Sequence, residues 1–309
     1  MEQAVFNIAG IKPRTVDVGH LRGDWTFLGP AIGCRDVGVR RIQVEPGFFS
    51  TPLHVHAHDE ETFFVLAGSG VSLQDDRAHE VRAGDCIVHG EAGEAHTLRA
   101  GDDGLDVLAF GVSREVSSGA RLPRVGMTWS ARSWFETGAG KSPFEREAEL
   151  GPPDVPPPSE RPSSIVNLDE AEAHESERKN HSGTWRSLAK QAGAKRTGLN
   201  HIALAPGQMG APPHCHASEE EVFVVLEGDG TLLLGDDPHP VKPLDIVARP
   251  AGTGVAHSFT AGENGLTFLA YGPWKPDEIV YYPRSNKIAF FGVGIITRVE
   301  KLDYWDGEE

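Results

Sequence analysis

The chain has 309 residues, of which 39% are hydrophobic and 24% charged, a composition typical of a globular protein with room for two domains. It carries 29 basic and 45 acidic residues, a formal net charge of −16. Nucleic acids and anionic membrane surfaces are therefore disfavoured as partners, because binding their phosphates needs clustered Lys and Arg.

The remaining composition points to a turn-rich β protein of the cytoplasm. The 36 glycines and 22 prolines favour short strands over helical bundles. Cys34, Cys86 and Cys215 form no C-x-x-C pair, which disfavours a disulfide framework or a zinc ribbon. The start, MEQAVFNIAG, does not resemble a signal peptide, and no apolar run approaches the length of a membrane span.

In chain order, the first half reads as a series of strands. Residues 38–47 predict a strand that ends in a Pro-Gly turn, and residues 62–75 predict a hairpin around a Gly-x-Gly turn. Strands at 81–90 and 105–111 follow. Many short strands at close spacing indicate a sandwich or a barrel.

A proline-rich stretch, GPPDVPPPSERPSS, separates this half from a second one and predicts an extended, semi-rigid linker. The second half repeats the pattern, with strands at 197–207, 241–250 and 266–272 and a hairpin at 222–236. We expect short helices only within 167–178 and 184–189.

The two halves match at a nearly constant spacing. Trp25 and Trp185 lie 160 positions apart, as do several other pairs, whereas His96 and His257 lie 161 apart because the second half has one extra residue. A shared spacing over a whole half predicts a duplicated domain. We therefore predict domains at 1–150 and 165–309, joined by the linker 151–164.

Each half contains three histidines and a glutamate that could hold a metal. His54 and His56 lie two positions apart, so on a strand both side chains point to one face. Glu61 opens the next predicted strand and His96 comes from a later one. Three imidazoles and one carboxylate suit a divalent transition metal. The second half repeats this set as His214, His216, Glu221 and His257.

A single H-x-H pair is often only surface polarity, and it is the repetition that argues for a metal site. We predict a metal in at least one half, with both halves loaded as the open alternative. Cys215 is expected to point away from the site, and His58 is expected in a turn because its match is Ser218. The remaining carboxylates of these turns are expected to be solvated: Glu60, Glu219 and Glu220.

Strand alternation also suggests walls for each pocket, although a role in the core explains the same residues equally well. The candidates are Phe63, Val65, Leu98, Phe223, Val225 and Phe259. On the preceding strand, Arg40 matches Asn200 and Arg41 matches His201. Pointing inward, they could hold a substrate carboxylate or transfer a proton, but we expect them at the surface.

The spacing of these residues resembles the motifs of the cupin superfamily. The first motif corresponds to Gly47, His54, His56, Glu61 and Gly68, and it recurs as Gly207, His214, His216, Glu221 and Gly228. The second motif ends at His96 and His257, with Gly90 in place of a proline and Leu244 in place of a glycine. The resemblance implies a mainly all-β bicupin, in which two double-stranded β-helix (jelly-roll) barrels pack face to face with short helices and a metal inside each barrel.

An octahedral metal with a His3Glu ligand set keeps two positions for a small oxygen-rich ligand. Iron, manganese, nickel, zinc and copper all remain open as the metal. We predict an enzyme of dioxygenase or oxidase type for a small organic acid or aromatic. A metal-dependent isomerase, lyase or decarboxylase is one alternative, although no lid motif of the oxalate decarboxylase type is found. A non-catalytic ligand-binding or sensing protein is another, and a homodimer is compatible with the sequence.

Overall fold

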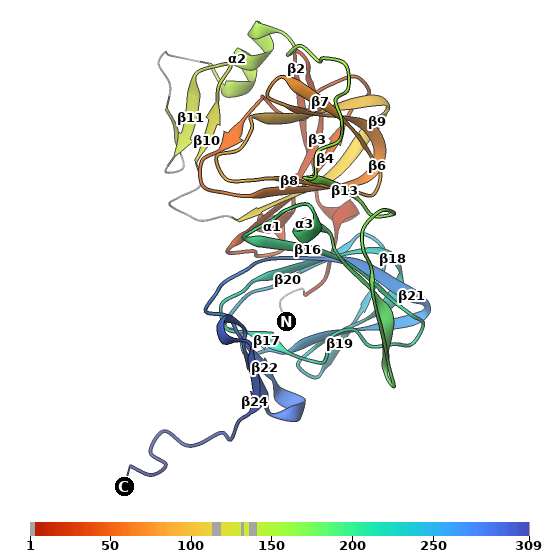
Figure 1. Cartoon of the computed structure of the whole chain (residues 1–309), viewed down its shortest axis with the longest axis vertical. Helices are drawn as coiled ribbons and strands as arrows, with labels where there is room; N and C mark the ends of the chain where they lie inside the picture. The colour runs from red at the N-terminus through yellow and green to blue at the C-terminus, as the bar shows by residue number, and fades with distance from the viewer. Residues whose placement is uncertain (1–3, 113–118, 131–132, 136–140, 309) are drawn as a thin grey trace.

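The computed structural model describes residues 4–112, 119–130, 133–135 and 141–308. Figure 1 shows two β-barrels placed one above the other along the long axis of the molecule. Each barrel contains an eight-stranded and a four-stranded sheet, and all strand pairs within these sheets are antiparallel. The predicted mainly β fold with two tandem barrels is confirmed.

The eight-stranded sheet of the first barrel has the order β13-β8-β6-β9-β4-β3-β2, with β7 paired to β6. Its strands are β2 (Arg14–Val18), β3 (Leu21–Phe27), β4 (Val37–Val44), β6 (Glu61–Gln74), β7 (Arg77–Arg82), β8 (Asp85–His89), β9 (His96–Val112) and β13 (Ile165–Asn167). The smaller sheet contains β5 (Val55–His56), β10 (Ala120–Leu122), β11 (Met127–Ser130) and β12 (Ser133–Phe135).

The second barrel repeats this arrangement with the order β1-β20-β18-β21-β16-β15-β14, and β19 pairs with β18. Its strands are β1 (Phe6–Asn7), β14 (His174–Arg178), β15 (His181–Ser187), β16 (Thr197–Leu204), β18 (Glu221–Leu234), β19 (Asp237–Val241), β20 (Asp245–Arg249) and β21 (His257–Pro273). The smaller sheet contains β17 (Cys215–His216), β22 (Ile279–Tyr282), β23 (Lys287–Phe290) and β24 (Ile295–Arg298).

Helices are short and lie outside the sheets: α1 (Leu28–Ala31), α2 (Pro143–Leu150), α3 (Leu188–Gln191) and the 3-10 turns η1 (Ile8–Gly10), η2 (Pro283–Ser285) and η3 (Phe291–Val293). The helix predicted within 167–178 is wrong. Of the one predicted within 184–189, only the last two residues are helical, as the start of α3. Residues 174–178 form strand β14 and residues 184–187 belong to β15, because pairing between these strands and with β16 overrides the local propensity.

The two predicted hairpins are also wrong, since 62–75 and 222–236 each lie mainly in one long strand that bends. The register of β6 shifts around Gly68 and Gly70, and that of β18 shifts around Gly228 and Gly230. A Cβ atom on Gly68 would lie 2.2 Å from the Gly104 carbonyl oxygen, and one on Gly70 would lie 2.1 Å from that of Arg99. These glycines therefore serve a close approach of two backbones at a bulge, not a turn.

The first strand of each half pairs with the other half's barrel. Strand β1 pairs with β20 of the second barrel, and β13 pairs with β8 of the first. Asn7 donates to Asp245 Oδ1 at 2.8 Å, and its match Asn167 donates to Asp85 Oδ1 at the same distance. Strand pairing thus crosses the domain boundaries drawn from the sequence, and Figure 1 shows the N-terminus beside the second barrel.

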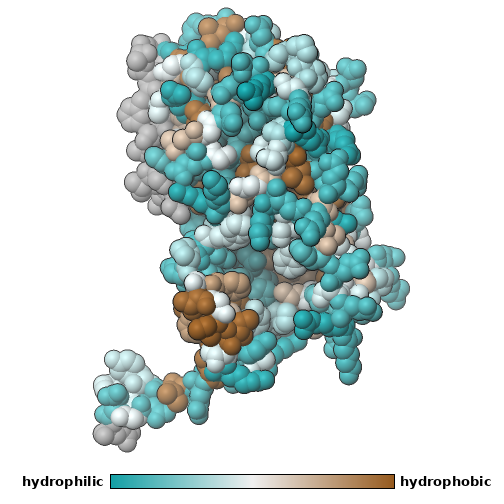
Figure 2. Space-filling model, viewed as in Figure 1, coloured by the Kyte–Doolittle hydropathy of each residue, from teal (hydrophilic) through white to brown (hydrophobic). Residues whose placement is uncertain are grey.

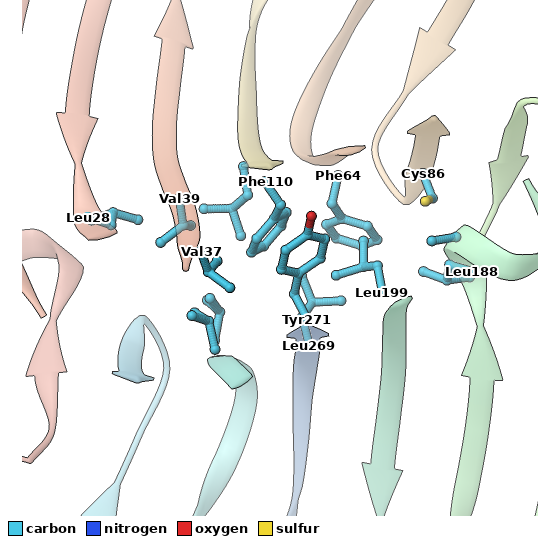
Figure 3. Packing of buried hydrophobic residues seen from close by; sticks show 14 of the residues in the cluster. Leu28, Val37, Val39, Phe64, Cys86, Phe110, Leu188, Leu199, Leu269 and Tyr271 are labelled. Carbon is cyan, nitrogen blue, oxygen red and sulfur yellow. The ribbon is translucent and has the colours of Figure 1, made fainter. Parts of the chain in front are cut away.

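A large apolar core joins the two barrels. Strand β4 contributes Val37 and Val39 to this core, whereas Ile42 and Val44 on its opposite face fill the first barrel. At the centre, Phe110 stacks on its match Tyr271 with ring centroids 4.8 Å apart (Figure 3). Because both faces of the strands are buried, the barrels pack as one body, face to face.

Two glutamates at matched positions of the two halves form hydrogen bonds across the interface between the barrels. Glu60 accepts hydrogen bonds from the backbone N–H groups of Lys195 and Thr197 in the other half. Glu220 accepts from the N–H groups of residues 35–37. The expectation that these carboxylates are solvated is wrong, since both are buried. Each satisfies several backbone N–H groups, among them the buried N–H of Thr197 or of Val37.

The proline-rich stretch follows the surface of the first barrel. Ser159 donates its backbone N–H to the Ala78 carbonyl, and Arg161 forms an ion pair with Asp85 at 2.7 Å.

In the second half, Figure 2 shows apolar side chains gathered on the lobe around β24. They are the exposed residues Phe291, Val293, Ile295 and Ile296. Among the helices described, none has the length and apolar character to cross a membrane.

Candidate metal centres

The first candidate centre lies inside the first barrel. The ligating atoms of His54, His56, Glu61 and His96 all lie within 4.8 Å of one another. Glu61 Oε2 lies 3.0 Å from His96 Nε2, 3.2 Å from His56 Nε2 and 3.5 Å from His54 Nε2. Antiparallel bridging of His54 to His96 and the pairing of β6 with β9 bring together residues that are distant in sequence.

Backbone carbonyls fix the orientation of two of these histidines. The Nδ1 of His54 donates to the Pro52 carbonyl at 3.0 Å, and the Nδ1 of His96 donates to that of Glu94 at 3.1 Å. A ring that donates through Nδ1 keeps its Nε2 lone pair for a metal. The backbone therefore selects the tautomer that a metal ligand needs.

The second centre repeats this geometry in the second barrel with His214, His216, Glu221 and His257, whose ligating atoms also lie within 4.8 Å of one another. Glu221 Oε2 lies 2.9 Å from His257 Nε2 and 3.0 Å from His216 Nε2. His214 Nδ1 donates to the Pro212 carbonyl at 2.8 Å. The two halves thus place the same four ligands on the same elements.

A residue that the sequence did not single out orients His216. Glu278 lies 3.2 Å from His216 Nδ1 and also accepts the backbone N–H groups of residues 217–219. A carboxylate on the distal nitrogen of a histidine ligand fixes its orientation and raises its basicity. Glu278 precedes β22, far from the H-x-H motif, and the matched residue in the first half is Ser118, so repetition could not reveal it.

The electrostatics favour a bound cation. Burial, reinforced by the neighbouring His96, lowers the pKa of His54 to about 4, and burial beside His257 lowers that of His214 to about 4. Burial alone would raise the pKa of Glu61, but the surrounding histidines hold the carboxyl well below its usual range. The neutral imidazoles of His54 and His214 and the ionised carboxylate of Glu61 are in the ligand forms that a divalent metal requires.

The pKa of His216 also indicates a site for a cation. Burial opposes its charge, but Glu221 and Glu278 outweigh burial and raise the pKa of His216 to about 10. Buried polar atoms also face one another without hydrogen-bond partners in the described part of the chain, namely His216 Nε2, Glu221 Oε2 and His257 Nε2. A metal at their meeting point would satisfy all three and replace the proton on His216, so the residues fit a metal ion.

Each centre opens into a cavity. The first cavity has a volume of about 560 Å³ and contains His54, His56 and Glu61 in its wall. The second has a volume of about 660 Å³ and contains His214, Glu221 and His257. Both volumes lie in the range of small-molecule sites.

The six predicted pocket-lining residues divide between the cavity and the cores. Phe223 and Phe259 line the second cavity. The other four are buried in the apolar cores of the barrels: Phe63, Val65, Leu98 and Val225. In the first cavity the wall comes from other residues, among them Arg40, Trp25 and Phe144.

Arg40 and Asn200, which were expected at the surface, line the cavities beside the ligands, and the Arg40 side chain is 37% exposed there. The guanidinium Nη2 of Arg40 lies 3.9 Å from Glu61 Oε1. Arg41 lies on the other face of β4, where it pairs with Asp106. His201 is buried, with a pKa that burial, together with nearby Arg186, lowers to about 4. The parity of Ile42 and Val44, which fill the barrel, would have predicted the inward direction of Arg40.

Three residues that the sequence analysis did not count as metal ligands lie outside the two His3Glu sets. His58 is exposed and lies 3.6 Å from Glu91. The thiol of Cys215 lies 3.9 Å from the Tyr281 carbonyl. Glu219 is only half-buried, and it accepts the backbone N–H of Lys275 at 2.6 Å. Burial raises the pKa of Glu219 to about 7, with Glu278 adding to the rise and the Lys275 N–H opposing it.

Fold and site together define a protein of two fused β-barrels, each with an internal His3Glu metal-binding site. Two segments of the sequence, residues 40–111 and 200–270, match the cupin domain family. The chain is therefore a bicupin, as the motifs predicted.

Solved structures of Bacillus subtilis oxalate decarboxylase share this fold. A serine-to-alanine variant of that enzyme has 17% sequence identity and a TM-score of 0.59, over 88% of this chain and 77% of the other. A structure reported with an assignment of the enzyme's Mn(II) centres has 15% identity and a TM-score of 0.58, with the same coverage. Comparison with curated proteins found no similar sequence.

Proposed function

We propose that the protein is a metal-dependent enzyme that acts on a small oxygen-rich organic acid at its first centre. The observation that carries this proposal is the position of Arg40. Its guanidinium lies in the cavity wall, 3.9 Å from the ligand Glu61 and beside His54 and His56. A cation at that place is suited to a substrate anion that also reaches the metal.

The residues around the first centre have separate roles in binding a substrate. Arg40 offers a planar pair of N–H donors to one carboxylate of the substrate and fixes its orientation. The buried histidines keep their Nε2 lone pairs, and Trp25 and Phe144 cover the cavity wall and limit water. A metal bound by the four ligands supplies Lewis acidity and open coordination positions.

Two reaction types are carried forward. The first is an oxidase or dioxygenase, in which the substrate is oxidised by O₂. The second is a decarboxylase, and the shared fold with oxalate decarboxylase favours it as the other candidate. Manganese is the metal we propose to load first, because the related structures include one with Mn(II) centres.

The test is a screen of small mono- and dicarboxylic acids with protein loaded in turn with Mn(II) and Fe(II). O₂ consumption identifies an oxidase or dioxygenase, whereas CO₂ release without O₂ consumption identifies a decarboxylase. For any substrate found, Arg40→Met should raise KM by about tenfold or more, because a charge-assisted bidentate contact is lost. Arg40→Lys should recover part of that loss. Acid binding without turnover under any metal would contradict the proposal and favour a binding protein.

A further inference from the structure

The second cavity continues past its metal ligands into the apolar interior of the barrel. Its wall includes Leu204, Phe259 and Phe268, which are buried core residues. The matched residues in the first half are Val44, Leu98 and Val107, and they are buried in the core cluster of the first barrel. The two centres therefore differ in what lies beyond the metal.

Hydroxyl side chains are buried beside the ligands of the first centre. Ser50, Thr51 and Thr97 are buried there, and Thr51 Oγ1 lies 3.2 Å from Thr97 Oγ1. The matched positions of Ser50 and Thr51 in the second half are Gly210 and Ala211, which line the second cavity. Loss of these side chains opens the space behind His214.

The opened space is lined by aromatic rings. Phe223 contacts Phe259 with centroids 5.0 Å apart, and Phe259 stacks on Phe268 at 4.7 Å. Where the first cavity has Arg40, the second has the neutral Asn200, whose Oδ1 accepts the indole N–H of Trp185 at 3.1 Å. The wall also contains two lysines: the ammonium of Lys275 is engaged by Asp36 at 2.7 Å, and Lys195 is exposed. The inner wall therefore suits an uncharged, apolar group.

We infer that the second centre binds a ligand of a different class from the first: an oxygen-bearing chelating head attached to an aromatic or similarly sized apolar body. The head binds at the metal of the His3Glu set, and the body occupies the space between Gly210 and Phe268. This inference rests on the part of the proposed function that places a metal at each centre.

The test compares two 2-hydroxy acids with the same chelating head, glycolate and 3-phenyllactate, by calorimetry on Mn(II)-loaded protein. His54→Ala/His56→Ala isolates the second centre, and His214→Ala/His216→Ala isolates the first. At the second centre, phenyllactate should bind about tenfold more tightly than glycolate or better, because its ring is buried. At the first centre the two affinities should agree within about threefold.

The double variant Gly210→Ser/Ala211→Thr introduces the residues of the first half into the second. It should remove most of the preference for phenyllactate while glycolate affinity and manganese content stay the same. Should that variant fail to fold, Gly210→Ser alone serves, since a Cβ there meets its nearest atom, of Leu204, at 3.4 Å.

Equal affinities at the second centre, or a preference that survives the substitutions in folded, metal-loaded protein, would overturn the inference. Protein that takes up no metal overturns both this inference and the proposed function. A preserved phenyllactate preference without turnover of any acid overturns only the proposed function.

Discussion

At the scale of single residues, the ligands of each centre decide how many metal ions the protein holds. The four ligands of each centre come from one barrel, so the centres should load independently. His54→Ala/His56→Ala should remove one of two metal equivalents, measured by elemental analysis of protein purified without a metal-affinity tag. His58→Ala is the matched control and should keep both, because His58 is exposed. Loss of both equivalents in the double variant would contradict independent centres.

Glu278 should control metal affinity without contacting the metal. Glu278→Gln removes the carboxylate from His216 Nδ1, where the two side chains lie 3.2 Å apart. We expect manganese affinity at the second centre to fall by about tenfold or more, measured by competition with a chelator. The first centre, which lies in the other barrel, is the internal control. Equal affinity in variant and wild type would show that the backbone of 217–219 suffices to orient the ligand.

His201 makes stability depend on pH outside the metal centres. Its folded-state pKa is about 4, lowered by burial and by Arg186, whereas an unfolded chain has a value of about 6.5. The unfolded state therefore binds the proton more readily, and stability is lost as pH falls from about 6.5 to about 4. His201→Gln should show a shallower loss in urea unfolding across that window. Parallel curves for the two proteins would contradict a neutral His201.

At the scale of elements, the matched glutamates of the interface should contribute strongly to stability. Glu60→Ala removes the acceptor of the buried Thr197 N–H, and Glu220→Ala removes that of the buried Val37 N–H. Each should lower the free energy of unfolding by about 4 kcal/mol, measured by urea unfolding. Glu91→Ala, which removes a partly exposed ion pair with Arg196, should change it by about 1 kcal/mol or less. Similar losses in all three variants would contradict the role of the backbone contacts.

The sequence predicts strands well where alternation is clear, and it fails where long-range contacts decide. Residues 38–47 predicted β4, whose apolar residues alternate on one face up to Val39 and on the other from Ile42. Gly68 and Gly70 suggested a turn, but the carbonyls that approach them come from 99 and 104, which local sequence does not reveal. Residues 174–178 have helical propensity but pair with β15.

The candidate ligands could be predicted because both halves of the sequence contain them. Site residues that occur in only one half were harder to predict. His54 and His214 were found because they share one spacing with their neighbours. Glu278 has no carboxylate match, so the duplication offered no signal for it. Arg40 was named only because it matches Asn200 in sequence, and its inward direction was not predicted. The residues that differ between the two centres are therefore the ones that a comparison of the two halves does not predict.

At the scale of the whole molecule, removal of the N-terminus should disturb the distant barrel. Deleting residues 1–7 leaves the edge of β20 unpaired, since Phe6 pairs with Ile246 and Asn7 with Asp245. Hydrogen exchange should therefore rise in β20, although β1 comes from the first half. Strand β8, which is covered by β13, is the matched control and should keep its protection. Faster exchange in β8 alone would contradict the observed pairing.

The reciprocal pairing of β1 and β13 also has a consequence for ancestry. A single ancestral copy with this strand order could complete its sheet only by lending its first strand to an identical chain. It would therefore have existed as an obligate pair. Joining two such copies in one chain allows the reciprocal pairing, with its Asn7–Asp245 and Asn167–Asp85 bonds, to form within one molecule, and each copy can then diverge. Fusion thus explains how Arg40 and Asn200 came to differ at matched places in one chain.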